Sequence, residues 1–250
     1  MVRMSQASQF SNRIFALLLC LWLPSLSYTV RAAQCPEESY SLSYQYQVDA
    51  LSALKCDAVT GSLRIMSSDI RDLSGLNSLT SIGGYLSIEN TNLRSLEGLV
   101  NLSSIGGVLW ILDNDLLTDI SSLNQVTSSI YGLRVSHNDS LTNLQGLSNI
   151  KPAAYVSFVD NRSLLNLDEL TGAQFVESFV EISQNPALLN IDGLSSLSFT
   201  GNVYITDNTS LENLEGFLGL SAAASLRVSG NSSLSTLSGL RNLSSVDDDL

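Results

Sequence analysis

The amino-acid sequence predicts an all-β solenoid, a parallel β-helix of about eight coils with 23–24 residues each. Three observations indicate this fold class. The phrase Ser-Ile-Gly-Gly at residues 81–84 returns at 104–107, pairs of aliphatic residues recur with the same period, and a polar residue follows each pair. A period this regular is typical of solenoids, whose repeats bury their apolar faces only by stacking on their neighbours.

The aliphatic pairs mark the expected strands. Within each pair an apolar residue alternates with a variable one, which is the period of an extended strand with one buried face. About 23 residues leave little room for a helix, so we expect short straight segments to complete each coil. The pairs are Leu63/Ile65, Leu86/Ile88, Leu109/Ile111, Leu133/Val135, Val156/Phe158, Val180/Ile182, Val203/Ile205 and Leu226/Val228.

A polar column lies three residues after the pairs. It begins with Ser68 and Thr91 and then holds only asparagine. A buried polar group must be hydrogen-bonded, so asparagines repeated in register are expected to form an internal ladder with the backbone of adjacent coils. The predicted ladder residues are Asn114, Asn138, Asn161, Asn185, Asn208 and Asn231.

The repeats resemble a known family. "CDAVTGSLRI" at 56–65, followed by "LTSIGGYLSI" at 79–88 and "LSSIGGVLWI" at 102–111, is similar to the receptor L-domain of insulin- and epidermal-growth-factor-type receptors. Similar repeats occur in fungal glycosylphosphatidylinositol-anchored wall proteins. The resemblance spans residues 35–250 and implies a right-handed β-helix with a disulfide near its N-terminal cap. The eight uniform repeats and the absence of a following cysteine-rich region depart from the animal receptors, so growth-factor binding is not carried over.

A leucine-rich-repeat horseshoe is the alternative fold, because Leu-x-Ile-x-x-Asn fits that repeat as well. The β-helix is favoured because most repeats place the next Leu three residues after the Asn. The glycine-rich turn before the strand also favours it.

The N-terminal region predicts export. Residues 1–32 have the features of a signal peptide, with arginines before the short apolar run 15–23 and Pro24 after it. Cys20 would leave with this peptide, and Cys35 and Cys56 would then form a disulfide that closes an N-terminal cap at residues 33–60. Within the cap, Val48, Leu51 and Leu54 have helical spacing and indicate an amphipathic helix over 47–56.

Residues 61–250 form the predicted repeat solenoid. Leu250 stands where a ninth strand would begin, so we expect an incomplete C-terminal end. An open edge of this kind favours self-association. Attachment to a membrane is expected only if the chain continues beyond Leu250.

Charge and motif content exclude several classes of function. The formal net charge of −12 disfavours nucleic acid as a partner. We find no nucleophile elbow, phosphate-binding loop or metal-ligand cluster, and His137 is the single histidine. We therefore expect no enzymatic activity, no cofactor and no metal.

The variable residue inside each aliphatic pair faces outward and forms the candidate partner face. Trp110 and Arg134 lie on adjacent expected strands, where they can form a cation–π pair. Exposed aromatic and arginine side chains are typical of interface hot spots. The predicted face residues are Arg64, Trp110, Arg134, Glu181, Tyr204 and Arg227.

Asn101 and Asn242 occupy equivalent sequons between inward leucines and are the predicted N-glycosylation sites. The sequons of the ladder asparagines are expected to stay unmodified because they point inward.

Together these features predict a secreted or cell-surface recognition or adhesion module that is not catalytic and binds an extracellular protein or glycan. Two alternatives remain open at this point. One is a structural protein of a cell wall or matrix with a lipid anchor, and the other is a truncated ectodomain of a signalling receptor.

Overall fold

The computed structural model describes residues 33–247 of the chain. The predicted signal peptide at 1–32 and the predicted start of a ninth strand at Leu250 lie outside these residues. Within 33–247, no helix has the length and apolar character that crossing a membrane requires.

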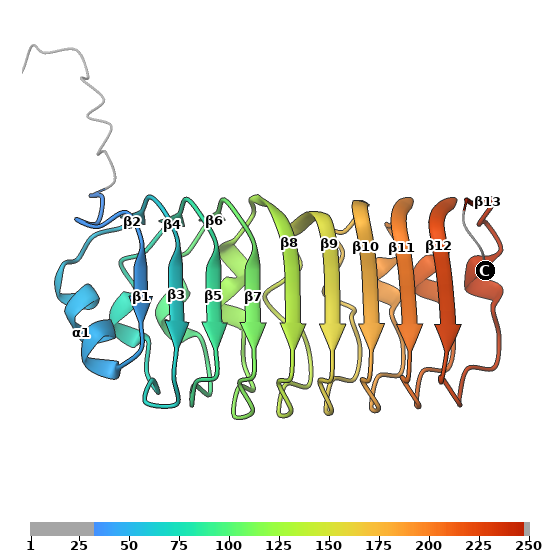
Figure 1. Ribbon diagram of the computed structural model, residues 1–250, viewed down its shortest axis with the longest axis horizontal. Coiled ribbons are helices and arrows are strands. Elements are labelled where there is room, and N and C mark those ends of the chain that lie inside the picture. The colour runs from blue at the N-terminus through green and yellow to red at the C-terminus, as the bar shows by residue number, and fades with distance from the viewer. Residues whose placement is uncertain (1–32, 248–250) are drawn as a thin grey trace, which may run out of the picture. The chain divides into compact units, whose positions relative to one another are not determined.

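A parallel sheet of ten strands dominates the structure, with the order β1-β3-β5-β7-β8-β9-β10-β11-β12-β13 (Figure 1). The mostly-β prediction is therefore confirmed at this level, while the right-handed winding and the number of coils stay predictions. The strands are β1 (Tyr40–Leu42), β3 (Leu63–Met66), β5 (Leu86–Glu89), β7 (Leu109–Leu112), β8 (Ser129–Ser136), β9 (Lys151–Val159), β10 (Phe175–Ser183), β11 (Phe199–Thr206), β12 (Ala222–Ser229) and β13 (Ser245–Val246).

A second parallel sheet explains the repeated Ser-Ile-Gly-Gly phrase. It contains β2 (Ala58–Val59), β4 (Ser81–Ile82) and β6 (Ser104–Ile105). The glycines that follow β4 and β6 lie where the chain turns into the large sheet. Neighbouring coils approach each other closely at these turns. A Cβ atom on Gly106 would lie 2.1 Å from the carbonyl oxygen of Gly83. From β8 to β12 one long strand replaces the two short ones, and the glycine pair is no longer present.

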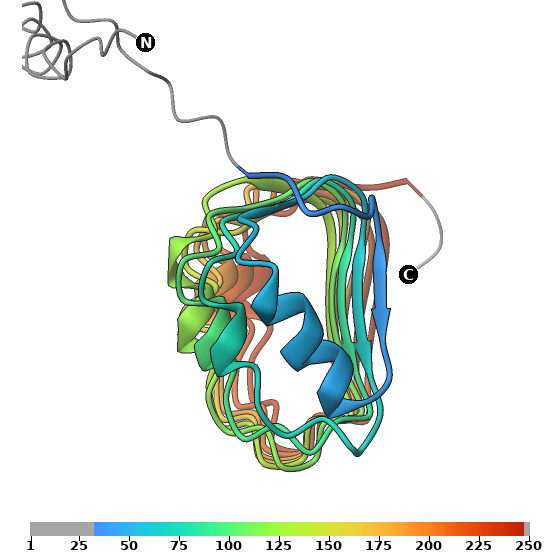
Figure 2. The same ribbon diagram turned by 90° about the vertical axis from the view of Figure 1, so that its left-hand side faces the viewer.

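Short 3-10 helices line the side of the coil opposite the large sheet (Figure 2). All of them except η2 follow a turn in which an Asp, Asn or Thr side chain accepts a backbone N–H two residues on, as Asp119 Oδ1 does from Ser121 at 2.8 Å. The sequence analysis missed this second polar column. The helices are η1 (Ser74–Leu76), η2 (Glu97–Leu99), η3 (Ser121–Gln125), η4 (Asp192–Leu194), η5 (Glu215–Phe217) and η6 (Ser238–Leu240).

The aliphatic pairs fill the interior. Parallel pairing sets Leu63 beside Leu86 and Leu86 beside Leu109, so like residues stack from coil to coil. All three leucines have no exposed surface. This continuous column of buried side chains is the hydrophobic core, and its burial is the main favourable contribution to folding.

The asparagine column lies inside the coil and is fully hydrogen-bonded. The Oδ1 atom of Asn138 accepts the backbone N–H of Asn114 at 3.2 Å. Its Nδ2 atom donates to the carbonyls of Ile111 and Ser136, both at 2.9 Å. The same arrangement recurs along the column and joins each coil to the next. Asn114, Asn138, Asn161, Asn185 and Asn208 have no exposed surface, and Asn231 is half-buried.

The residue before each ladder asparagine has left-handed backbone geometry. His137 has φ 56° and Asp113 has φ 56°. Asparagine, aspartate and glycine tolerate this conformation better than other residues, which accounts for the composition of the column. His137 is exposed and lies 3.9 Å from Asp113 and 3.8 Å from Asp160.

The N-terminal cap contains a helix and the disulfide. Helix α1 (Gln45–Ala53) lies across the first coil, with Val48 and Leu51 buried against the core (Figure 2). The inward placement expected for Leu54 is wrong: the helix ends at Ala53, and Leu54, the residue that follows, is 48% exposed.

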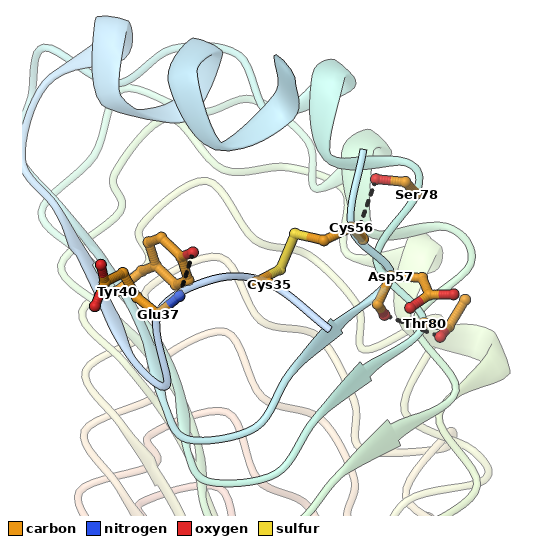
Figure 3. The surroundings of a disulfide bond; sticks show 7 residues. All are labelled: Cys35, Glu37, Tyr40, Cys56, Asp57, Ser78 and Thr80. Atoms are coloured by element: carbon orange, nitrogen blue, oxygen red, sulfur yellow. Dashed lines mark hydrogen bonds between the residues drawn. A yellow bond between two sulfur atoms is a disulfide. The ribbon is translucent and has the colours of Figure 1, made fainter. Parts of the chain in front are cut away.

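Cys35 and Cys56 form a disulfide beside β2 (Figure 3). The cap residues also contribute strands, since β1 pairs with β3 and β2 pairs with β4. The first coil is therefore part of the cap, and the cap is continuous with the repeats that follow.

Candidate functional site

The outward side of the large sheet, here called the sheet face, carries all the predicted face residues in one row. Strand register pairs Arg64 with Ser87, Ser87 with Trp110, and Trp110 with Arg134. The row continues through Ser157, Glu181 and Tyr204 to Arg227 on β12. Arg134 and Arg227 are exposed, whereas Arg64, Trp110, Glu181 and Tyr204 are half-buried.

Trp110 belongs to an aromatic cluster that the sequence analysis did not assemble. The cluster consists of Tyr85, Trp110, Tyr131, Tyr155 and Phe179 on the sheet face. Tyr155 stacks on Phe179 with a centroid distance of 5.3 Å, and Tyr85 stacks on Trp110 at 5.9 Å. The indole N–H of Trp110 donates a hydrogen bond to the Tyr155 hydroxyl at 2.7 Å.

Gly132 makes room for this arrangement. It lies on β8 between the strands that carry Trp110 and Tyr155. A Cβ atom at Gly132 would lie 2.2 Å from Cε1 of Tyr155, so any other residue would displace the tyrosine ring. The absence of a side chain on β8 allows the ring to reach across that strand.

Three rings of the aromatic cluster, those of Trp110, Tyr155 and Phe179, line a small pocket, here called the Trp110 pocket, with a volume of about 240 Å³. Buried Ser157 lies between the larger side chains, and Leu112 adds an apolar contact. The pocket therefore combines apolar walls with a few polar groups, as ligand sites do. It is lined by Glu89, Trp110, Leu112, Arg134, Tyr155, Ser157 and Phe179.

The acidic group of the pocket is already paired. Glu89 accepts hydrogen bonds from Arg64 at 2.6 Å and from the Ser87 hydroxyl. Burial acts to raise the pKa of Glu89, but the hydrogen bonds from Arg64 and Ser87 and the charge of Arg64 outweigh it, so the pKa lies below its usual value. The hydrogen bond with Glu89 in turn raises the pKa of Arg64.

Within residues 33–247, the guanidinium of Arg134 does not form the expected cation–π pair with Trp110. The indole is occupied by Tyr85 and Tyr155 instead, and Arg134 Nε lies 3.3 Å from the hydroxyl of Ser136. Burial raises the pKa of Tyr155, while the Trp110 hydrogen bond and the charge of Arg134 oppose the increase. Arg134 therefore contributes to the pocket through its positive charge rather than through a stacking contact with Trp110.

The two predicted glycosylation sites are exposed. Asn101 and Asn242 follow η2 and η6 and donate through Nδ2 to the carbonyls of Asn77 at 2.8 Å and Leu218 at 2.7 Å. An N-linked glycan replaces one of two amide hydrogens, so this hydrogen bond and a glycan are compatible. The ladder sequons at Asn138, Asn161 and Asn208 are fully buried.

A larger pocket of about 920 Å³ lies where the last described coil meets β13. Its apolar walls include Leu226, Leu240 and Leu243. Self-association at this end stays a prediction. Within 33–247, no group of three or more His, Cys, Asp or Glu side chains is arranged to hold a metal ion.

Comparison with known families matches residues 55–152 to the receptor L domain, so the resemblance seen in the sequence is confirmed for these repeats. Receptor L domains are non-enzymatic, ligand-binding modules of receptor ectodomains. The matched segment includes Trp110, Gly132 and Arg134 and covers less than half of the 250-residue chain. No curated protein matches the chain.

Proposed function

Starting from the receptor L-domain repeats, we propose that this protein is an extracellular recognition module that binds a protein through the sheet face. The observation that carries the proposal is the aromatic cluster around Trp110 with its adjacent pocket. Tryptophan, tyrosine and arginine dominate interface hot spots, and here all three types line one pocket on an otherwise regular sheet.

The size of the sheet face supports this role. Ten strands at a spacing of about 4.8 Å extend about 43 Å. With strands of four to nine residues over most of the sheet, the face offers an area on the order of 800 Å². One partner in a standard protein–protein interface contributes about this area.

The distribution of the predicted glycans also supports it. Asn101 and Asn242 follow 3-10 helices, and those helices lie opposite the large sheet (Figure 2). Glycans at these positions would cover the helical side and leave the sheet face accessible. The fully satisfied asparagine ladder adds a rigid scaffold, so little conformational entropy is lost when a partner binds.

The experiment is a binding screen of the protein against arrays of extracellular proteins and of glycans. Trp110→Ala with Arg134→Ala should weaken binding to protein partners at least about tenfold, because truncating a hot spot costs about 1–2 kcal/mol or more. The control is Arg94→Ala with Leu165→Ala, two exposed side chains outside the large sheet. If both double variants weaken the binding of a partner equally, or if neither variant weakens it, recognition by the sheet face is contradicted. That result would favour a structural role in a wall or matrix.

A further inference from the structure

We infer that the Trp110 pocket receives a carboxylate of the protein partner, presented by an acidic side chain next to an apolar one. The inference rests on the proposed function and specifies the chemistry of its central contact. It follows from the hydrogen-bond donors, charge, ring geometry and size of the pocket.

Two residues of the pocket have hydrogen-bond donors that lack acceptors within the described residues. The Tyr155 hydroxyl accepts from Trp110, and its own hydrogen has no acceptor. The guanidinium of Arg134 uses only Nε, at 3.3 Å from Ser136, and leaves both Nη groups without partners. An occupant that accepts hydrogen bonds would satisfy both residues, and a carboxylate does so with two oxygens.

The local charge favours an anion even though the chain as a whole is acidic. The carboxylate of Glu89 is paired with Arg64 at 2.6 Å, and Glu181 beside the pocket accepts from Ser157 at 2.8 Å. Among residues 33–247 no carboxylate lies within ion-pair distance of Arg134. Among the residues that line the pocket, the uncompensated charge is therefore the positive charge of Arg134, whereas Glu181, which lies beside the pocket, accepts from a neutral hydroxyl and keeps its negative charge.

The rings present a matching surface. Tyr155 and Phe179 are nearly parallel, with an interplanar angle of 9° and a centroid distance of 5.3 Å, so each covers part of one face of the other. The inner faces of the pair are thereby less open, and the ring edges, where the quadrupole is positive, attract an anion. Sugar rings, in contrast, pack on open aromatic faces. This geometry favours a carboxylate with an apolar neighbour over a glycan.

The size of the pocket favours one group of a larger partner. A volume of about 240 Å³ is below the range of about 300–1,000 Å³ that encloses free small-molecule ligands. Half-buried Val159 and Tyr204 extend the surface beyond the pocket. An acidic side chain can thus enter the pocket while the rest of the partner covers the surrounding sheet face.

The test uses a matched pair of probes on the full chain, N-acetyl-phenylalanine with its free carboxylate and the neutral N-acetyl-phenylalanine amide. The indole N–H resonance of Trp110 reports binding, and the variant Trp22→Phe distinguishes it from the resonance of Trp22, the other tryptophan of the sequence, in the predicted signal peptide. We expect the carboxylate probe to bind more tightly than the amide. Arg134→Gln should weaken the carboxylate probe about tenfold and leave the amide unchanged, since one charge-assisted hydrogen-bond pair is lost.

Arg227→Gln is the matched control, because Arg227 is exposed in the same row on β12 and does not line the Trp110 pocket. Equal binding of the two probes, no binding of either, or equal effects of the two arginine variants would overturn the inference. A second pair of probes, glucuronate and its neutral control glucose, tests an acidic glycan as the alternative occupant of the pocket. Tighter binding of glucuronate than of N-acetyl-phenylalanine would also overturn the inference, in favour of an acidic glycan.

The outcome separates this inference from the proposed function. If array partners still require Trp110 and Arg134 but the probes show no preference for the carboxylate, recognition by the sheet face stands and the carboxylate site is wrong. If the carboxylate preference depends on Arg134 but array partners bind the Trp110→Ala/Arg134→Ala variant as well as the native protein, the proposed function is wrong and the carboxylate site stands.

Discussion

The indole N–H of Trp110 donates a 2.7 Å hydrogen bond to the hydroxyl of Tyr155, 45 residues further along the chain. The two residues lie on β7 and β9, with β8 between them. The contact exists because Gly132 on β8 has no side chain in the path of the tyrosine ring. It organises the aromatic cluster and, with it, the candidate binding pocket.

Gly132→Ala should therefore displace the Tyr155 ring and break its hydrogen bond with Trp110. Overpacking of this kind costs about 1–3 kcal/mol in stability. Urea unfolding measures the free-energy change, and the indole N–H resonance of Trp110 measures the lost contact. In the double variant Gly132→Ala/Tyr155→Ala the clash is absent, so the effects should be non-additive. Simple additivity would refute the steric explanation.

Asn161→Ala should be strongly destabilising, because Asn161 is central in the ladder. Its removal leaves the backbone N–H of Asn138 without its partner in the interior and takes one hydrogen bond away from the carbonyl of Val135. An unsatisfied buried group costs about 1–3 kcal/mol and a lost hydrogen bond about 1 kcal/mol, so we expect a loss of about 3 kcal/mol in urea unfolding.

The control for the ladder is Asn149→Ala. Exposed Asn149 makes a single side-chain bond, 3.0 Å from Nδ2 to the carbonyl of Asn124. Water can replace that bond, so the expected loss is within about 0.5 kcal/mol. Similar losses for the two variants would mean that the ladder contributes no more than a surface contact.

Removing the disulfide with Cys35→Ser/Cys56→Ser should lower stability by about 3 kcal/mol in the chain-entropy model, given the sequence separation of 21 residues. Thermal unfolding with and without a reducing agent measures the effect. The reductant should destabilise the native protein and leave the double variant unchanged. A reductant effect of equal size in both would show that the disulfide is not its target.

The ion pair between Glu89 and Arg64 predicts a pH-dependent contribution to stability. The folded pKa of Glu89 lies below its unfolded value of about 4.3, so the native state binds fewer protons in this range. The stabilisation is present above the unfolded pKa and is lost as pH falls through the folded pKa.

Glu89→Gln should thus destabilise the protein more at pH 7 than at pH 3, as measured by urea unfolding at both pH values. The same substitution in an Arg64→Gln background provides the control, because the partner charge is already absent. A difference that is independent of pH in the native background would contradict the assigned pair.

In a glycosylating host, mass spectrometry should find glycans at Asn101 and Asn242 and none at Asn161 once the protein is folded. The reason is accessibility, since the first two residues are exposed and Asn161 is fully buried. Substantial occupancy at Asn161 would mean that modification precedes formation of the ladder.

Much of the fold is encoded locally and repeats, which is why the sequence alone predicts it. Leu63 and Leu86 must both face inward, because a shift of one residue would turn every aliphatic pair toward solvent. The placement of Leu54 failed for the opposite reason. It depends on where one short helix ends against the first coil, and helix ends are weakly specified by local sequence.

The sequence by itself determined the period, the inward residues and the row that contains Trp110 and Arg134, since each follows from a repeated pattern along one strand. Only the tertiary structure decided what those side chains touch. Tyr155 reaches Trp110 across Gly132, and Arg64 takes Glu89, because lateral contacts depend on the volumes of residues from several coils at once. No period along the chain encodes such combinations, so the pocket emerges only when the coils are stacked.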